Sequence, residues 1–109
     1  MLDKETVIKM CEQYASEVLK ILNQEAIVLF GSYSKGTEKI DSDIDIAIIV
    51  DVLIEDYLVV SKQLYKLRRN ISASIEPILI ISSSDKSGFV DEILRRGIII
   101  YKSQKFSFK

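Results

Sequence analysis

The segment at residues 43–50, Asp-Ile-Asp-Ile-Ala-Ile-Ile-Val, alternates acidic residues with isoleucine and then becomes wholly apolar. This pattern predicts a strand that enters a hydrophobic core from one hydrated end. Because alternate side chains of a strand share a face, Asp43 and Asp45 would lie on the same face, with their Cα atoms roughly 6 to 7 Å apart. Two carboxylates so close together repel each other, and a cation between them would remove that repulsion.

The available residue types restrict what such a cation site can be. The 109-residue sequence has no histidine and a single cysteine, which excludes His-dependent triads, Cys and His zinc sites and an intrachain disulfide. Ligands that offer only oxygen favour magnesium or manganese. A calcium loop of the EF-hand type would begin at Asp41, but it needs glycine where this chain has Ile46 and glutamate where it has Val52. The remaining alternative is a solvated turn that binds nothing.

A glycine-containing loop precedes the acidic strand. A short apolar run ends at Gly31, Ser32 follows directly, and Lys35 lies further along the loop. A glycine at a strand end lets backbone N–H groups approach a phosphate, the serine hydroxyl adds a donor, and lysine could supply charge. Gly31 and Gly36 have the spacing of the P-loop glycines, but Thr37 stands where the P-loop lysine belongs, which argues against an NTPase of that class. The alternative is an ordinary glycine turn.

Hydrophobic periodicity predicts the remaining elements. It indicates amphipathic helices over residues 3–22 and 53–69, strands over residues 25–31, 73–81 and 98–101, and a last helix that Ser84 caps and Gly97 ends. Cys11 lies on the apolar stripe of the first helix and is predicted to be a core residue. The order of elements predicts an α/β (α+β) fold, with a sheet packed with helices in one domain.

Charge and composition restrict the function further. A net charge of -1, with 48% hydrophobic and 28% charged residues, is typical of an ordinary soluble globule. It provides no general attraction to nucleic acid or to anionic membranes. No signal peptide and no membrane-spanning run is recognisable, so a cytoplasmic protein is expected.

Two sequence blocks carry a family resemblance. Residues 29–36, Leu-Phe-Gly-Ser-Tyr-Ser-Lys-Gly, and residues 42–48, Ser-Asp-Ile-Asp-Ile-Ala-Ile, together resemble the signature of the minimal nucleotidyltransferases, the MNT group of the DNA polymerase beta-like superfamily. The metal motif, the phosphate loop and their separation all agree, which makes the combination specific. The resemblance covers residues 1–101 and leaves residues 102–109 as a short basic and aromatic C-terminal tail. It implies the polymerase beta-like nucleotidyltransferase fold, built on a single small mixed β-sheet.

The resemblance also implies roles for individual residues. Gly31 and Ser32 would bind the nucleotide triphosphate, with Lys35 as a nearby source of positive charge. Asp43 and Asp45 would be catalytic carboxylates that bind the metal ions. Such a site would use Mg²⁺, or Mn²⁺ in its place, with ATP as the substrate that the family leads us to expect.

A third carboxylate on the next strand completes the site in this family, and here that position falls on Glu76. Glu76 would be a metal ligand and could accept the proton of the acceptor hydroxyl. The family usually has aspartate there, so the extra methylene is a departure that puts the second metal or the acceptor's activation in doubt. Pro77 beside it predicts a strand edge or a bulge. The alternative is that Glu76 is an exposed charge on an edge strand.

The implied function is that of a magnesium-dependent nucleotidyltransferase that transfers AMP from ATP to an acceptor hydroxyl. Family members of this size resemble the antitoxin half of HEPN and MNT toxin–antitoxin pairs, which modify a tyrosine of the HEPN toxin. The alternative is a catalytically weak or inactive module that binds nucleotide or a partner and neutralises a toxin sterically. Self-association through an exposed strand edge is also compatible with the sequence.

Overall fold

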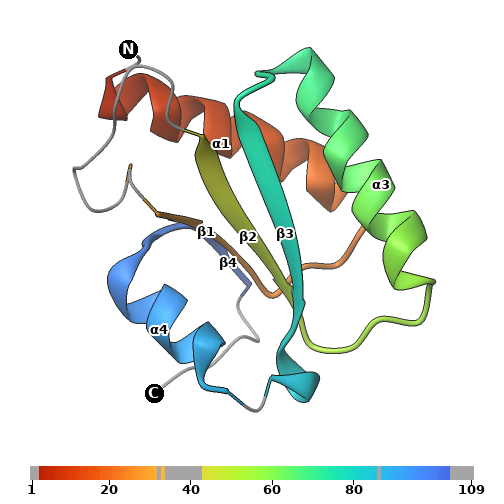
Figure 1. The fold of residues 1–109 in the computed structure, drawn as a ribbon. Helices are drawn as coiled ribbons and strands as arrows, with labels where there is room; N and C mark the ends of the chain where they lie inside the picture. Colours follow the sequence, from red (N-terminus) through yellow and green to blue (C-terminus); the bar gives the residue numbers. More distant parts are fainter. Residues whose placement is uncertain (1–2, 32, 34–42, 86, 104–109) are drawn as a thin grey trace.

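The computed structural model describes residues 3–31, 33, 43–85 and 87–103 (Figure 1). These residues include a four-stranded sheet with the strand order β3-β2-β1-β4. The strands are β1 (Ala26–Phe30), β2 (Ile44–Val50), β3 (Ile75–Ile81) and β4 (Ile98–Lys102), and the helices are α1 (Lys4–Leu19), α3 (Tyr57–Leu67) and α4 (Phe89–Arg96). β2 and β3 are parallel, whereas β1 is antiparallel to both β2 and β4. The predicted mixed sheet packed with helices is confirmed.

The sheet separates two hydrophobic clusters. The larger one lies between the sheet, α1 and α3, and it contains Ile44 and Ile46 of β2. The smaller one lies beneath α4 and contains Ala47 and Ile49. Because alternate residues of a strand face opposite sides, Asp45 projects from the side of the sheet that α4 covers.

Helix α1 is fixed at its start and along its buried face. The Asp3 side chain caps it by accepting a hydrogen bond from the N–H of Thr6 at 2.8 Å. Cys11 is fully buried, which confirms the prediction that it is a core residue. The hydroxyl of the buried Tyr14 donates a hydrogen bond to the Leu64 carbonyl at 2.6 Å and thereby ties α1 to α3.

Helix α3 begins later than its apolar spacing predicts. It starts at Tyr57 rather than at residue 53, because Asp56 is its N-cap and accepts hydrogen bonds from the N–H groups of Leu58 and Val59. Such a cap typically contributes about 1 kcal/mol to helix stability. The cap therefore sets the start, while the apolar stripe extends beyond it.

The predicted cap of the last helix is wrong. Ser84 ends a short 3-10 turn, and α4 starts after Gly88, which has a φ of +79°. The Asp85 side chain instead accepts a hydrogen bond from the N–H of Val90 at 3.0 Å. A carboxylate reaches into the first turn here, where the positive end of the helix dipole favours negative charge.

The edge strands of the sheet are β3 and β4. β3 is one edge strand, which confirms the edge position predicted from Pro77. β4 is the other and runs through Lys102, after which the N–H of Ser103 donates to the Glu25 carbonyl at 2.8 Å. The rest of the predicted tail, residues 104–109, lies outside the described part of the chain. None of the described helices has the length and apolar character needed to span a membrane.

Candidate active site

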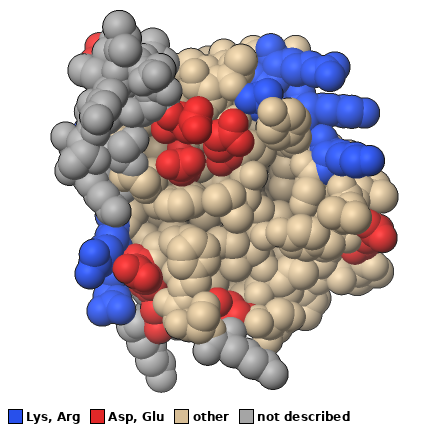
Figure 2. All heavy atoms as spheres, in the orientation of Figure 1, with Lys and Arg blue, Asp and Glu red and all other residues tan. Residues whose placement is uncertain are grey.

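Three acidic residues lie together where β2 and β3 begin. Asp45 on β2 is the register partner of Glu76 on β3, and Asp43 directly precedes β2. Because β2 and β3 are parallel and begin at the same end of the sheet, these positions lie side by side on one face. Figure 2 shows acidic side chains gathered on the surface over the start of these two strands. The structure therefore brings the three sequence-predicted carboxylates into one region.

This arrangement has an electrostatic consequence for Asp45. Burial raises the pKa of its carboxyl above the ordinary value of 3.8, and the negative charges of Asp43 and Glu76 raise it further. The carboxylates thus repel one another, and a bound cation would relieve that repulsion. A donor set of carboxylate oxygens fits a hard divalent cation such as Mg²⁺.

The metal-ligand set itself stays a prediction. Within the described ranges, no group of three or more His, Cys, Asp or Glu residues is arranged to hold a metal ion. Asp43, Asp45 and Glu76 would therefore have to converge further to share one.

Gly31 lies against the central carboxylate. It has a φ of +77°, a backbone conformation that glycine adopts readily and other residues rarely do. A Cβ atom at this position would lie 2.2 Å from Oδ2 of Asp45. Glycine is therefore required here for two reasons, the backbone conformation and the room that it leaves for the Asp45 side chain.

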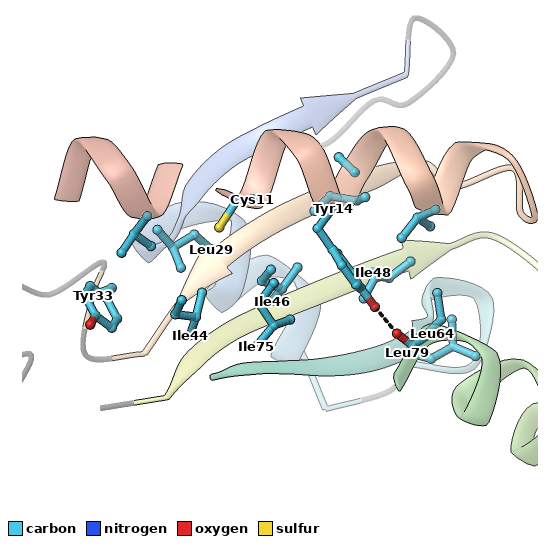
Figure 3. Close-up of a cluster of buried hydrophobic side chains, with 14 of the residues drawn as sticks. Cys11, Tyr14, Leu29, Tyr33, Ile44, Ile46, Ile48, Leu64, Ile75 and Leu79 are labelled. Atoms are coloured by element: carbon cyan, nitrogen blue, oxygen red, sulfur yellow. Dashed lines mark hydrogen bonds between the residues drawn. The ribbon is translucent and has the colours of Figure 1, made fainter. Parts of the chain in front are cut away.

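The loop that follows Gly31 is described only in part. Ser32 and Lys35, the other predicted nucleotide-binding residues, lie outside the described residues. Tyr33 is 2% exposed and belongs to the larger hydrophobic cluster, at the end where Ile44 lies (Figure 3). Tyr33 itself therefore packs into the core close to the start of β2.

A pocket that sequence reasoning missed lies beside Gly31. The rings of Phe30 and Phe89 meet edge to face, with centroids 6.5 Å apart and planes at 90°. They form part of a cavity of about 290 Å³ lined by Phe30, Gly31, Phe89, Glu92, Ile93, Arg96 and Gly97. The one signal in the sequence is that Phe30 directly precedes Gly31, and its partner Phe89 lies on a helix far along the chain.

Comparison with known families identifies this fold. A family model described as polymerase beta, nucleotidyltransferase matches residues 5–106. The chain belongs to the polymerase beta nucleotidyltransferase family. Nucleotidyltransferases of this fold use a nucleotide and a divalent metal ion, which agrees with the chemistry of the carboxylate region. No curated protein matches the chain.

Solved structures with a similar fold include a nucleotidyltransferase and chains from toxin–antitoxin complexes. A candidate nucleotidyltransferase from Sulfolobus solfataricus has a TM-score of 0.67 at 21% identity, covering 96% of this chain and 88% of that one. A chain from a toxin–antitoxin complex with AMP-PNP has a TM-score of 0.59 at 25% identity, covering 95% and 77%. A chain from a complex of the tri-AMPylated Shewanella oneidensis HEPN toxin with its MNT antitoxin has a TM-score of 0.58 at 22% identity, covering 90% and 75%.

Proposed function

We propose that this nucleotidyltransferase transfers AMP from ATP to a tyrosine hydroxyl of a HEPN partner protein and thereby acts as its antitoxin. The observation that carries the proposal is the grouping of Asp43, Asp45 and Glu76 next to Gly31. Two proteins of the same fold support the nucleotide and the acceptor, because one is in a complex with AMP-PNP and the other is in a complex with a tri-AMPylated HEPN toxin.

Each residue of the site has a role in this reaction. Asp43 and Asp45, with Glu76 as a third ligand, would hold Mg²⁺ or Mn²⁺, which neutralises phosphate oxygens when it is bound. Gly31 and Ser32 bind the triphosphate and direct its α-phosphate toward the carboxylates. The acceptor oxygen forms a bond to the α-phosphorus while the bond to the bridging oxygen breaks, and pyrophosphate leaves. Glu76 accepts the proton of the acceptor hydroxyl.

Label transfer tests this proposal directly. The purified protein is incubated with a HEPN protein from the same source and ATP labelled at the α-phosphate, with and without magnesium. We expect magnesium-dependent label on the HEPN protein, and no label with Asp43→Asn/Asp45→Asn. Asp51→Asn is the matched control, because Asp51 is an exposed acid that follows the opposite end of β2. Label transfer that survives in the double variant would contradict the proposal.

Steric neutralisation without catalysis is the competing function. The observation that favours it is Glu76, which stands where the family usually has aspartate. The two functions differ in what Asp45→Ala does to cells that express the HEPN toxin. Loss of protection by a variant that is still folded supports catalysis, whereas full protection supports steric neutralisation.

A further inference from the structure

The cavity at Phe30 and Phe89 adjoins the carboxylate region. Phe30 is the register partner of Asp45 on one side, and Asp45 is the register partner of Glu76 on the other. The three residues therefore form a row across β1, β2 and β3 on the face that α4 covers. Neighbouring strands lie about 4.8 Å apart, so the cavity begins about one strand spacing from Asp45. Gly31 belongs to both regions, since it lines the cavity and contacts the Asp45 carboxylate.

The cavity has the size and the walls of a site for one planar ring system. Its volume of about 290 Å³ lies at the lower limit of small-molecule pockets, which start near about 300 Å³. Phe30, Phe89 and Ile93 supply apolar and aromatic surface, and Phe89 is 42% exposed. At the rim, Arg96 and Glu92 form a 3.8 Å ion pair with side chains 73% and 56% exposed, which leaves hydrogen-bonding capacity toward a ligand.

The order of these residues across the sheet indicates on which side the acceptor and the nucleotide lie. Asp45 lies between Glu76 on the β3 side and Phe30 on the β1 side. An acceptor whose proton goes to Glu76 approaches from the β3 side, which leaves the β1 side for the nucleotide. We propose that the cavity lined by Phe30 and Phe89 binds the base of the nucleoside triphosphate, with the base against Phe89 and its polar edge toward Arg96 and Glu92. This inference rests on the proposed function and assigns the part of the substrate that the carboxylates do not contact.

Binding measurements separate the base from the phosphates. Titration calorimetry of ATP and of inorganic tripolyphosphate, each with magnesium, is performed on wild type, Phe89→Ala and Phe89→Leu. Stacking on an aromatic side chain changes base affinity by about 5- to 150-fold, so we expect a loss in that range for ATP and none for tripolyphosphate. Phe89→Leu preserves apolar bulk and helix packing, so its loss of ATP affinity isolates the aromatic ring. Leu19→Ala is the control, because Leu19 is 44% exposed and lines a different pocket near the opposite end of β2.

Unchanged ATP affinity in both Phe89 variants would overturn the inference, as would an equal loss for tripolyphosphate. Photolabelling with 8-azido-ATP adds a direct readout, with modification expected within residues 88–97 and modification of β3 counting against the site. If Phe89→Ala raises the KM for the acceptor but not for ATP, the acceptor ring occupies the cavity and the inference fails. ATP binding that depends on Phe89 without any AMP transfer would instead refute the proposed function and leave the base site standing.

Discussion

Gly31→Ala tests the contact on which the geometry of the carboxylate region depends. The substitution carries two costs. A φ of +77° is strained for alanine, which costs about 1–2 kcal/mol. The new Cβ would also lie 2.2 Å from Oδ2 of Asp45, so the carboxylate must move by about 1 Å to regain an ordinary nonbonded separation. A displacement of that size at a reacting centre typically lowers the rate by about 100-fold.

Gly88→Ala is the matched control because only one of the two costs applies to it. Gly88 has a φ of +79°, and a Cβ placed there meets nothing within 4 Å. Urea unfolding should therefore show a loss of about 1–2 kcal/mol for Gly88→Ala and a larger loss for Gly31→Ala. At saturating ATP, AMP transfer should fall about 100-fold in Gly31→Ala and stay near the wild-type rate in Gly88→Ala.

A double-mutant cycle gives the result that would refute this reasoning. Asp45→Ala removes the oxygen that the new Cβ would strike and leaves the Asp45 Cβ, which lies at 3.3 Å. In the Asp45→Ala background, Gly31→Ala should lower the free energy of unfolding by no more than Gly88→Ala lowers it in wild type. If Gly31→Ala lowers the free energy of unfolding equally in wild type and in Asp45→Ala, the carboxylate contact contributes nothing and the steric argument is wrong.

Three further predictions concern side chains that the fold wholly or partly buries. The folded-state pKa of Asp45 is raised above 3.8, so its charge destabilises the fold at pH 7. Asp45→Asn should therefore raise the Tm at pH 7 without magnesium, and this gain in Tm should vanish below pH 3.8. A gain in Tm that does not change with pH would contradict this reasoning. Burial and the Glu12 charge raise the pKa of Cys11 to about 12, so a thiol reagent at pH 8 should modify it only through unfolding; immediate reaction of the native protein would count against this. Tyr14→Phe leaves the Leu64 carbonyl without its donor and should cost about 1–3 kcal/mol in urea unfolding, a result that an unchanged midpoint would disprove.

Part of the carboxylate grouping was accessible from the sequence because it depends on a local rule. Alternation along one strand places Asp43 and Asp45 on one face. Glu76 was expected beside them only through the family resemblance, and the parallel pairing of β2 and β3 places it next to Asp45. The core position of Cys11 followed in the same way from helical spacing.

Other features depend on contacts that no local pattern encodes. The start of α4 depends on a competition among several polar residues, in which Asp85 rather than Ser84 reaches the first turn. The contact of Gly31 with Asp45 depends on the antiparallel register of β1 and β2. The aromatic pocket requires α4 to pack over the end of β1, which brings Phe89 to Phe30.

The strand order has a consequence for synthesis on the ribosome. β1 is flanked by β2 and by β4, and Ala26 pairs with Lys102. A nascent chain that has not yet released residue 102 exposes one whole edge of β1, with unpaired N–H and C=O groups that another chain could bind. The sheet can be completed only after β4 has emerged, so a product that terminates before β4 should tend to aggregate rather than to persist as a smaller folded enzyme.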